Sequence, residues 1–133
     1  MWISNFFTLR EATVTSTGLE NKIEDEKILE NVIYTASRMD TIRQFFNSAC
    51  LVTSFYRSVK VNNAVSGAKN SAHLRGMAVD FSVRGINISE VFEKIKKSGL
   101  SYDQLIFYPK SGFVHVAFCK NIEKERKQAF TQY

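Results

Sequence analysis

Three residues of types that bind metal ions stand out in the sequence. The chain has only two histidines, His73 and His115, and Asp80 follows the first of them closely. Two neutral imidazoles and one carboxylate form a ligand set that suits Zn²⁺ and leaves a fourth coordination position for water. A site of this composition keeps a net positive charge, which would lower the pKa of that water and polarise a carbonyl group.

Each of these residues also has an ordinary structural interpretation. A single histidine in a strand belongs more often to the core or the surface than to a metal site, and a single aspartate is more often an edge or turn residue. The spacing of His73 and Asp80 alone is therefore a weak signal, and the flanking residues have to decide between the two interpretations.

The segment 77–83 is predicted to be a strand that projects Asp80 from its polar face. Successive side chains of a strand point to opposite faces, and here apolar residues alternate with small or polar ones. The apolar face carries Met77, Val79, Phe81 and Val83, and the other face carries Ala78, Asp80 and Ser82. A small, polar loop over 67–72 precedes this strand and leads into His73.

His115 is predicted to lie on a β-hairpin. The strand-like segments 104–108 and 113–118 are joined by a turn rich in Pro, Ser and Gly. Pairing of the residues on either side of this turn places on one face of the hairpin Gln104, Ile106, Tyr108, Phe113 and His115.

The other elements complete an α+β pattern. An apolar stripe with helical spacing runs from the N-cap Asp25 to Phe46, and a second such stripe begins at the cap Asn87 and is closed by Gly99. A strand over 50–56 and a short helix over 59–65 are also expected. The predicted fold is a small, mainly antiparallel sheet packed against helices.

The length of 133 residues fits one domain. We expect it to span 1–133, with a core at about 7–118 and a C-terminal tail or helix over 119–133. Cys50 and Cys119 lie far apart and form no CxxC pair, so we expect two buried, reduced cysteines. We expect a monomer.

The net charge of +5 favours anionic partners such as a cell wall, anionic lipid or nucleic acid. The charge is spread along the chain, and the basic segment 120–127 contains Glu123 and Glu125, so it is interpreted as a solvated helix face. No basic stripe with interleaved aromatics occurs, so nucleic acid is not an expected partner. No apolar run approaches the roughly 20 residues that cross a bilayer, so no membrane association is expected.

The residues around the candidate ligands resemble motifs of the zinc D-Ala-D-Ala carboxypeptidases and dipeptidases, a family that also includes L-alanyl-D-glutamate endopeptidases of phage lysins. The resemblance rests first on Ser71-x-His73-x-x-Gly76-x-Ala78-x-Asp80, followed by Val114-His115-Val116. It extends from about Phe7 to Phe118 through Phe7-x-Leu9-x-Glu11, Ser54-Phe55-Tyr56-Arg57-Ser58, Val61-Asn62-x-Ala64-Val65-x-Gly67 and Tyr102-Asp103-Gln104-Leu105-Ile106.

This resemblance implies a hedgehog/DD-peptidase-like fold and assigns roles to several residues. His73, Asp80 and His115 would be the zinc ligands. Arg57 would hold a substrate carboxylate through a bidentate pair, Ser71 would hydrogen-bond substrate or the His73 loop, and Gln104 would be a further substrate contact.

The sequence departs from the family at the general base. Many members have a glutamate three residues before the second histidine, where this chain has Gly112, and a related subgroup has a glutamate near the position of Tyr108. Asp103 is our candidate base, with a turn-capping residue as its alternative interpretation. Tyr108 is a second candidate, as a donor to the oxyanion, and a zinc site with feeble or absent hydrolysis is a third possibility.

The leading hypothesis is a zinc metallopeptidase that hydrolyses the stem peptide of peptidoglycan. Residues 1–7 lack the features of a signal peptide, so we expect synthesis in the host cytoplasm and action at the bacterial wall, as in a phage endolysin released at lysis or carried in the virion. One alternative is a non-catalytic zinc module that binds wall peptides or a partner. A basic nucleic-acid binder is another, and its binding would fall steeply with salt.

Overall fold

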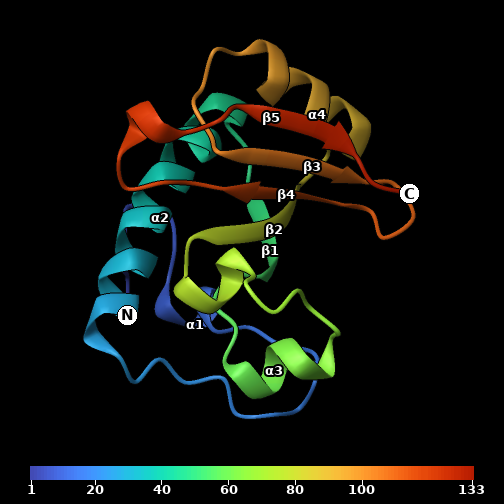
Figure 1. The fold of residues 1–133 in the computed structure, drawn as a ribbon. Coiled ribbons are helices and arrows are strands. Elements are labelled where there is room, and N and C mark those ends of the chain that lie inside the picture. The colour runs from blue at the N-terminus through green and yellow to red at the C-terminus, as the bar shows by residue number, and fades with distance from the viewer.

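The computed structural model describes all residues of the chain, 1–133. Figure 1 shows a sheet with helices at its sides and ends. In chain order the elements are α1 Leu9–Ala12, α2 Glu26–Phe46, β1 Cys50–Ser54, α3 Val59–Ala64, the 3₁₀ helix η1 Ala72–Arg75, β2 Ala78–Val83, α4 Ile88–Lys97, β3 Gln104–Tyr108, β4 Phe113–Ala117, the 3₁₀ helix η2 Ile122–Lys124 and β5 Gln128–Thr131.

The five strands form one sheet in the order β1-β2-β4-β3-β5. Every neighbouring pair is antiparallel except β3 and β5, which run parallel. The expected α+β fold with a mainly antiparallel sheet is therefore confirmed. Tyr108 pairs with Phe113 across the β3–β4 turn and Ile106 pairs with His115, which is the register that the hairpin pattern predicts.

The two faces of the sheet differ in polarity. One row across the central strands, Val79–Val116–Leu105, is fully buried and belongs to the hydrophobic core with α2 and α4. The next row, Asp80–His115–Ile106, points to the opposite face because strand side chains alternate. This second face therefore carries polar side chains, among them Asp80 and His115.

Helix α2 supplies much of the apolar layer that covers the core. Asp25 caps its start by accepting hydrogen bonds from the backbone N–H groups of Lys27 and Ile28, as expected for an N-cap. Its fully buried apolar side chains repeat at helical spacing and face the sheet: Val32, Ala36 and Met39. The helix ends at Asn47, which adopts a left-handed conformation.

The C-terminal segment differs from the prediction, because it is neither a tail nor an α-helix. After η2 it forms β5, which lies on β3 at the edge of the sheet (Figure 1). Glu125 is not on a solvated face but is buried, where it makes two hydrogen bonds of 2.8 and 3.0 Å with the guanidinium of Arg38 from α2. The partner lies far away in the sequence, so the local charge pattern does not reveal it.

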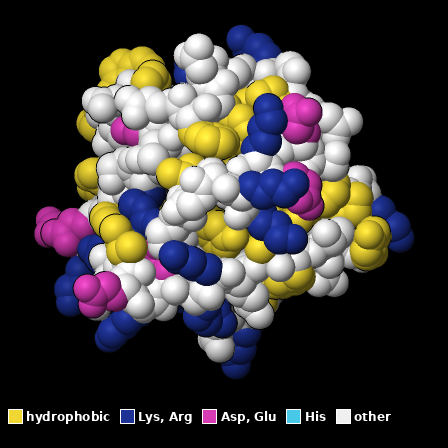
Figure 2. Space-filling view, turned by 90° about the horizontal axis from the view of Figure 1, so that it is seen from above, with side chains coloured by type: hydrophobic (Ala, Val, Ile, Leu, Met, Phe, Trp, Pro, Cys, Tyr) yellow, Lys and Arg dark blue, Asp and Glu magenta, His cyan; other side chains and the backbone are white.

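The surface carries its positive charge in a dispersed form. Figure 2 shows Lys and Arg side chains scattered over one face of the molecule, with Asp or Glu beside several of them. Both cysteines are free, and only Cys50 is buried, whereas Cys119 is partly exposed. None of the helices combines the length and the apolar character that crossing a bilayer requires.

Candidate metal centre

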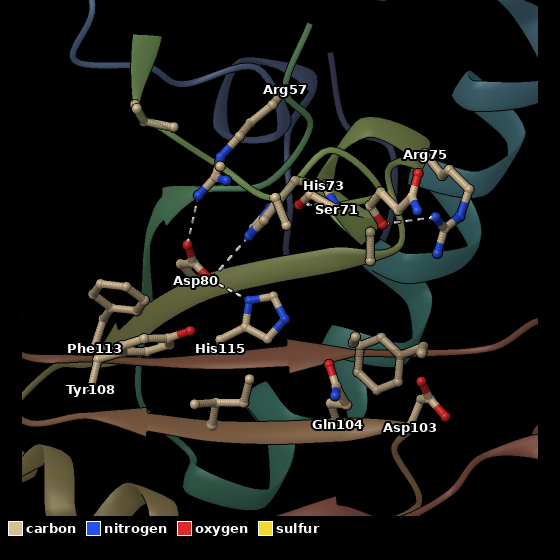
Figure 3. A pocket seen from close by; sticks show the side chains of 18 of the residues that line it. Arg57, Ser71, His73, Arg75, Asp80, Asp103, Gln104, Tyr108, Phe113 and His115 are labelled. Atoms are coloured by element: carbon tan, nitrogen blue, oxygen red, sulfur yellow. Dashed lines mark hydrogen bonds and ion pairs between the residues drawn. The ribbon is translucent and has the colours of Figure 1, made fainter. Parts of the chain in front are cut away.

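A cleft of about 600 Å³ opens on the polar face of the sheet. Its floor is formed by β2, β3 and β4, and one wall is the segment from Val65 to Arg75, which includes η1 (Figure 3). One end of the cleft is lined by the beginning of β3, the end of β4 and Arg126. Arg57 enters the cleft from the chain that follows β1.

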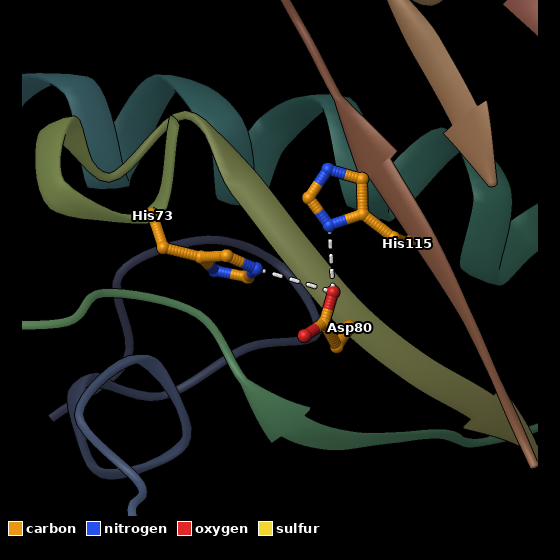
Figure 4. A group of neighbouring side chains, drawn as sticks. All are labelled: His73, Asp80 and His115. Carbon is orange, nitrogen blue, oxygen red and sulfur yellow. Dashed lines mark hydrogen bonds and ion pairs between the residues drawn. The ribbon is translucent and has the colours of Figure 1, made fainter. Parts of the chain in front are cut away.

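The structure brings His73, Asp80 and His115 together on the floor of this cleft (Figure 4). Oδ1 of Asp80 lies 3.2 Å from Nε2 of His73 and 2.8 Å from Nδ1 of His115. One possible ligand atom from each residue lies within 4.8 Å of the others. Zinc–ligand bonds are about 2 Å long, so atoms this close to each other could bind one ion together.

The position of His73 depends on the short helix η1. Ser71 caps this helix, and its hydroxyl oxygen accepts a hydrogen bond of 3.2 Å from the backbone N–H of His73. Gly76 ends the helix with φ of +70°, and a Cβ there would lie 2.5 Å from Val32 Cγ2. Glycine is therefore required for the chain to turn from His73 into β2 while touching α2.

The hydrogen bonds of His73 show which ring nitrogen is available as a ligand. Nδ1 lies 2.7 Å from the backbone carbonyl oxygen of Phe55, which can only accept, so Nδ1 carries the hydrogen. In the neutral ring, Nε2 then has a lone pair, and it faces a carboxylate oxygen of Asp80. Two acceptors that face each other need a proton or a metal cation between them, so the donor set fits a metal ion.

Asp80 is 4% exposed, and its second oxygen has its own partner. Oδ2 accepts a hydrogen bond of 3.3 Å from Nη2 of Arg57. Burial alone would raise the pKa of Asp80, but its contacts with the imidazole rings of His115 and His73 outweigh this effect and hold the pKa well below its usual range. The carboxylate is therefore ionised, as a metal ligand must be.

Arg57 is held by three side chains around its guanidinium. Nε donates to Ser54 Oγ at 3.0 Å, and Nη1 donates to Asn62 Oδ1 at 3.3 Å, in addition to the contact with Asp80. Gly67 lies against this pair, because a Cβ at its position would be 2.0 Å from Asn62 Oδ1 and 3.0 Å from Arg57 Nη1. The Asn62 and Gly67 positions of the family-like segment therefore set the place of Arg57.

Tyr108 stands beside the three candidate ligands at the opposite end of the cleft from Asp103 (Figure 3). Its ring stacks on Phe113, with centroids 4.9 Å apart. Burial, together with the negative charge of Asp80, raises the pKa of Tyr108. Its hydroxyl group is therefore protonated at neutral pH and can donate a hydrogen bond.

The sequence predicted that Asp103 lies next to the candidate ligands, but the structure places it farther away. Asp103 lies three residues before Ile106, the residue that pairs with His115. This spacing separates Asp103 from the level of His115 by about 10 Å along the strand. Its carboxylate instead binds Arg126, with bonds of 3.0 Å to Nε and 2.8 Å to Nη2. The hydrogen bond from this guanidinium lowers the pKa of Asp103, which weakens it as a base.

Gln104, which we expected to contact substrate, lies on the cleft floor near Asp103 (Figure 3). Its Nε2 donates to Oε1 of Gln128 at 2.8 Å, so its carbonyl oxygen is free to face the cleft. Asp80 and Asp103 are the only carboxylates that line the cleft, and Gly112 has no neighbouring atoms within 4 Å of the position of a Cβ.

Sequence reasoning missed Arg126 and Cys119, which line the cleft from the C-terminal segment. Arg126 sits in a run of charged residues and reaches the cleft only because β5 pairs with β3. A register prediction for β5 was the one signal that could have revealed it, and the sequence pattern there is too short for such a prediction.

Comparison with known proteins identifies the family. The sequence matches the family Peptidase M15 over residues 5–117. It is 39% identical over 70 residues to the peptidoglycan L,D-endopeptidase MepK of Escherichia coli K12, covering 47% of this chain and 36% of that protein. It is 33% identical over 78 residues to the probable peptidoglycan L,D-endopeptidase MepK of Haemophilus influenzae, covering 53% of this chain and 39% of that protein.

The matched part thus spans less than half of the length of these two relatives. The family match itself covers most of the present chain, including β1 to β4 and the three candidate metal ligands. The resemblance drawn from the motifs is therefore confirmed, and so is the hedgehog/DD-peptidase-like fold. The chain belongs to the peptidase M15 family.

Proposed function

We propose that this protein is a zinc-dependent peptidase that cleaves stem peptides of peptidoglycan at the bacterial cell wall. The observation that carries the proposal is the His73–Asp80–His115 cluster on the floor of an open cleft. The named relatives act as peptidoglycan L,D-endopeptidases, which favours an internal bond between an L- and a D-residue over a D-Ala-D-Ala carboxypeptidase reaction. The phage origin stays a prediction from the sequence.

The metal would be held by His73 Nε2, an oxygen of Asp80 and a ring nitrogen of His115. When bound, zinc supplies a Lewis acid that polarises a carbonyl group and lowers the pKa of a water molecule. The bond from Phe55 keeps the His73 lone pair directed at this position, and Arg57 restrains the other oxygen of Asp80.

Two other side chains would act on the substrate. Arg57 uses three of its five N–H groups within the protein, which leaves two for a substrate carboxylate. Tyr108 would donate its hydroxyl hydrogen to the carbonyl oxygen as negative charge develops there. Both residues line the cleft on the side of Asp80.

A second candidate function, a non-catalytic zinc module that binds wall peptides, is favoured by one observation. No carboxylate stands where the family glutamates occur, since Gly112 and Tyr108 occupy those positions and Asp103 is paired with Arg126. This alternative predicts zinc content and peptide binding without turnover.

The deciding experiment incubates zinc-loaded protein with purified peptidoglycan and reads the released fragments by mass spectrometry. We expect soluble peptide fragments from the wild type and none from His115→Ala. The masses would also identify the bond that is cut. Turnover that survives His115→Ala would overturn the metal-dependent mechanism, and zinc binding with no fragments would favour the non-catalytic module.

A further inference from the structure

We propose that Arg126, together with Arg75, forms a second substrate subsite at the far end of the cleft, specific for a carboxylate remote from the bond that is cut. The inference rests on the proposed function, because the carboxylate belongs to the bound peptide. Asp103 is the residue that positions Arg126 in this subsite.

The location fits a side group of an extended peptide. Asp103 and Arg126 lie about 10 Å along the sheet from the level of His115. An extended peptide advances about 3.3 Å per residue, so this distance corresponds to two or three residues. A peptide with its reacting carbonyl at the candidate metal centre would therefore place a group two or three residues away at this end. Arg75 faces it from the opposite wall (Figure 3).

The ion pair with Asp103 orients the guanidinium of Arg126 but uses only part of its N–H donors. Nε and Nη2 each donate one hydrogen bond to Asp103, and the backbone N–H of Arg126 donates to the same carboxylate at 3.0 Å. A guanidinium has five N–H groups, so three remain without a partner in the protein. The side chain of Arg126 is 60% exposed, and these free donors can reach an incoming group.

The charge balance of the cleft favours an anion at this end. Three arginines and two aspartates line the cleft: Arg57, Arg75, Arg126, Asp80 and Asp103. Asp80 pairs with Arg57 and Asp103 pairs with Arg126, so Arg75 keeps an uncompensated charge. Its one hydrogen bond goes to the backbone carbonyl of Asn70, at 3.5 Å. A carboxylate between Arg75 and Arg126 would meet donors on two sides.

The subsite depends on the C-terminal segment, which lies beyond the family match at 5–117. Glu125, directly before Arg126, is anchored in the interior by Arg38 and by the backbone N–H of Cys119. In the extended chain here, neighbouring side chains point to opposite sides. The anchor of Glu125 therefore turns Arg126 outward to the cleft.

The test compares two peptides that differ only at the residue two or three positions from the scissile bond, one with a free carboxylate and one with a carboxamide. Binding is measured by calorimetry and hydrolysis by mass spectrometry, for the wild type, Arg126→Gln and Arg126→Lys. The exposed Lys124→Gln serves as the charge-matched control. Thermal unfolding verifies that each variant is folded.

We expect the wild type to bind the carboxylate peptide more tightly and Arg126→Gln to lose at least about tenfold in affinity for it, with little change for the carboxamide. The affinity of Arg126→Lys should lie between those of the wild type and Arg126→Gln, because lysine keeps the charge but not the paired N–H donors of the guanidinium. Lys124→Gln should match the wild type. Equal affinity of the wild type for both peptides, an equal loss for both in Arg126→Gln, or no binding at all would overturn the subsite. Discrimination in binding without hydrolysis would support the subsite and refute the proposed peptidase activity.

Discussion

The backbone carbonyl of Phe55, which follows the end of β1, accepts a hydrogen bond from Nδ1 of His73 at 2.7 Å. This bond links the edge of the sheet to η1 and selects the tautomer in which Nε2, the nitrogen that faces Asp80, keeps its lone pair. The ring is 2% exposed and cannot turn away without breaking the bond. The protein thus holds the His73 ring in the orientation and tautomer that a ligand of a cation needs.

Zinc should therefore stabilise the folded protein. At free zinc one hundred times the dissociation constant, mass action adds about 2.7 kcal/mol to the free energy of unfolding. We expect a higher melting temperature with zinc for the wild type and no increase for Asp80→Asn, measured by scanning fluorimetry. Glu90→Gln, on the exposed face of α4, is the matched control and should respond as the wild type does.

Gly67→Ala should disturb the cleft through Asn62 and Arg57 rather than by direct contact with the candidate ligands. The new Cβ would overlap Asn62 Oδ1, which must move and release Arg57. Overpacking of this kind costs roughly 1–3 kcal/mol of stability, and displacement of Arg57 should raise KM for a peptide with a carboxylate.

A double variant separates the clash from the lost hydrogen bond. In Asn62→Ala/Gly67→Ala the clash is removed, so stability should recover in part while KM stays high. Recovery of both quantities would show that Asn62 does not hold Arg57 in its working position.

Asp103→Asn distinguishes a positioning residue from a general base. If Asp103 only orients Arg126, the variant should raise KM for a carboxylate peptide several-fold and leave kcat near the wild-type value. Loss of a general base would instead lower kcat by about 10²–10⁴-fold. Steady-state kinetics on both Asp103→Asn and Arg126→Gln distinguishes the two roles. A raised KM with little change in kcat in both variants is expected only if Asp103 positions Arg126.

Tyr108→Phe removes one hydroxyl group and keeps the ring that stacks on Phe113. Removal of an oxyanion donor typically costs about 10²–10³-fold in kcat, and we expect a loss in or just below that range with KM almost unchanged. An unchanged kcat would exclude this residue from the reaction.

The buried Arg38–Glu125 pair makes stability depend on pH. Burial acts to raise the pKa of Glu125, but its hydrogen bonds, led by the one from Arg38, hold the pKa below the usual 4.5. The contribution is therefore fully present above about pH 4.5 and is lost as the pH falls through the lower, folded-state value.

Glu125→Gln leaves Arg38 without its charged partner, so it should cost about 3 kcal/mol or more near pH 7. This difference from the wild type should shrink on acidification below pH 4.5. Denaturant unfolding of both proteins from pH 7 to pH 3 measures it, and a difference that stays constant over this range would contradict the assignment.

Local signals in the sequence predicted much of the framework. Asp25 and Asn87 cap the helices that they were expected to cap, and the hairpin has the expected register, Tyr108 opposite Phe113. These features depend on neighbours in the chain or on a short turn, so the pattern of a few residues is sufficient.

Features that depend on distant partners were harder to predict. Glu125 is buried because Arg38, from another element, neutralises it, and β5 forms because β3 offers an open edge. The position of Asp103 was within reach of the sequence, because the predicted hairpin register already put it three residues from the level of His115.

The contrast between the two free thiols has a practical consequence. Cys50 lies in the core, where burial raises its pKa to about 12, so almost none of it is thiolate at neutral pH. Partial burial, together with the carboxylates of Asp103 and Glu125, raises the pKa of Cys119 as well, so the difference lies in exposure: Cys119 is partly exposed and belongs to the cleft wall. A maleimide dye should therefore attach to the natural protein at one place, and its fluorescence would report the arrival of a peptide without any engineered cysteine.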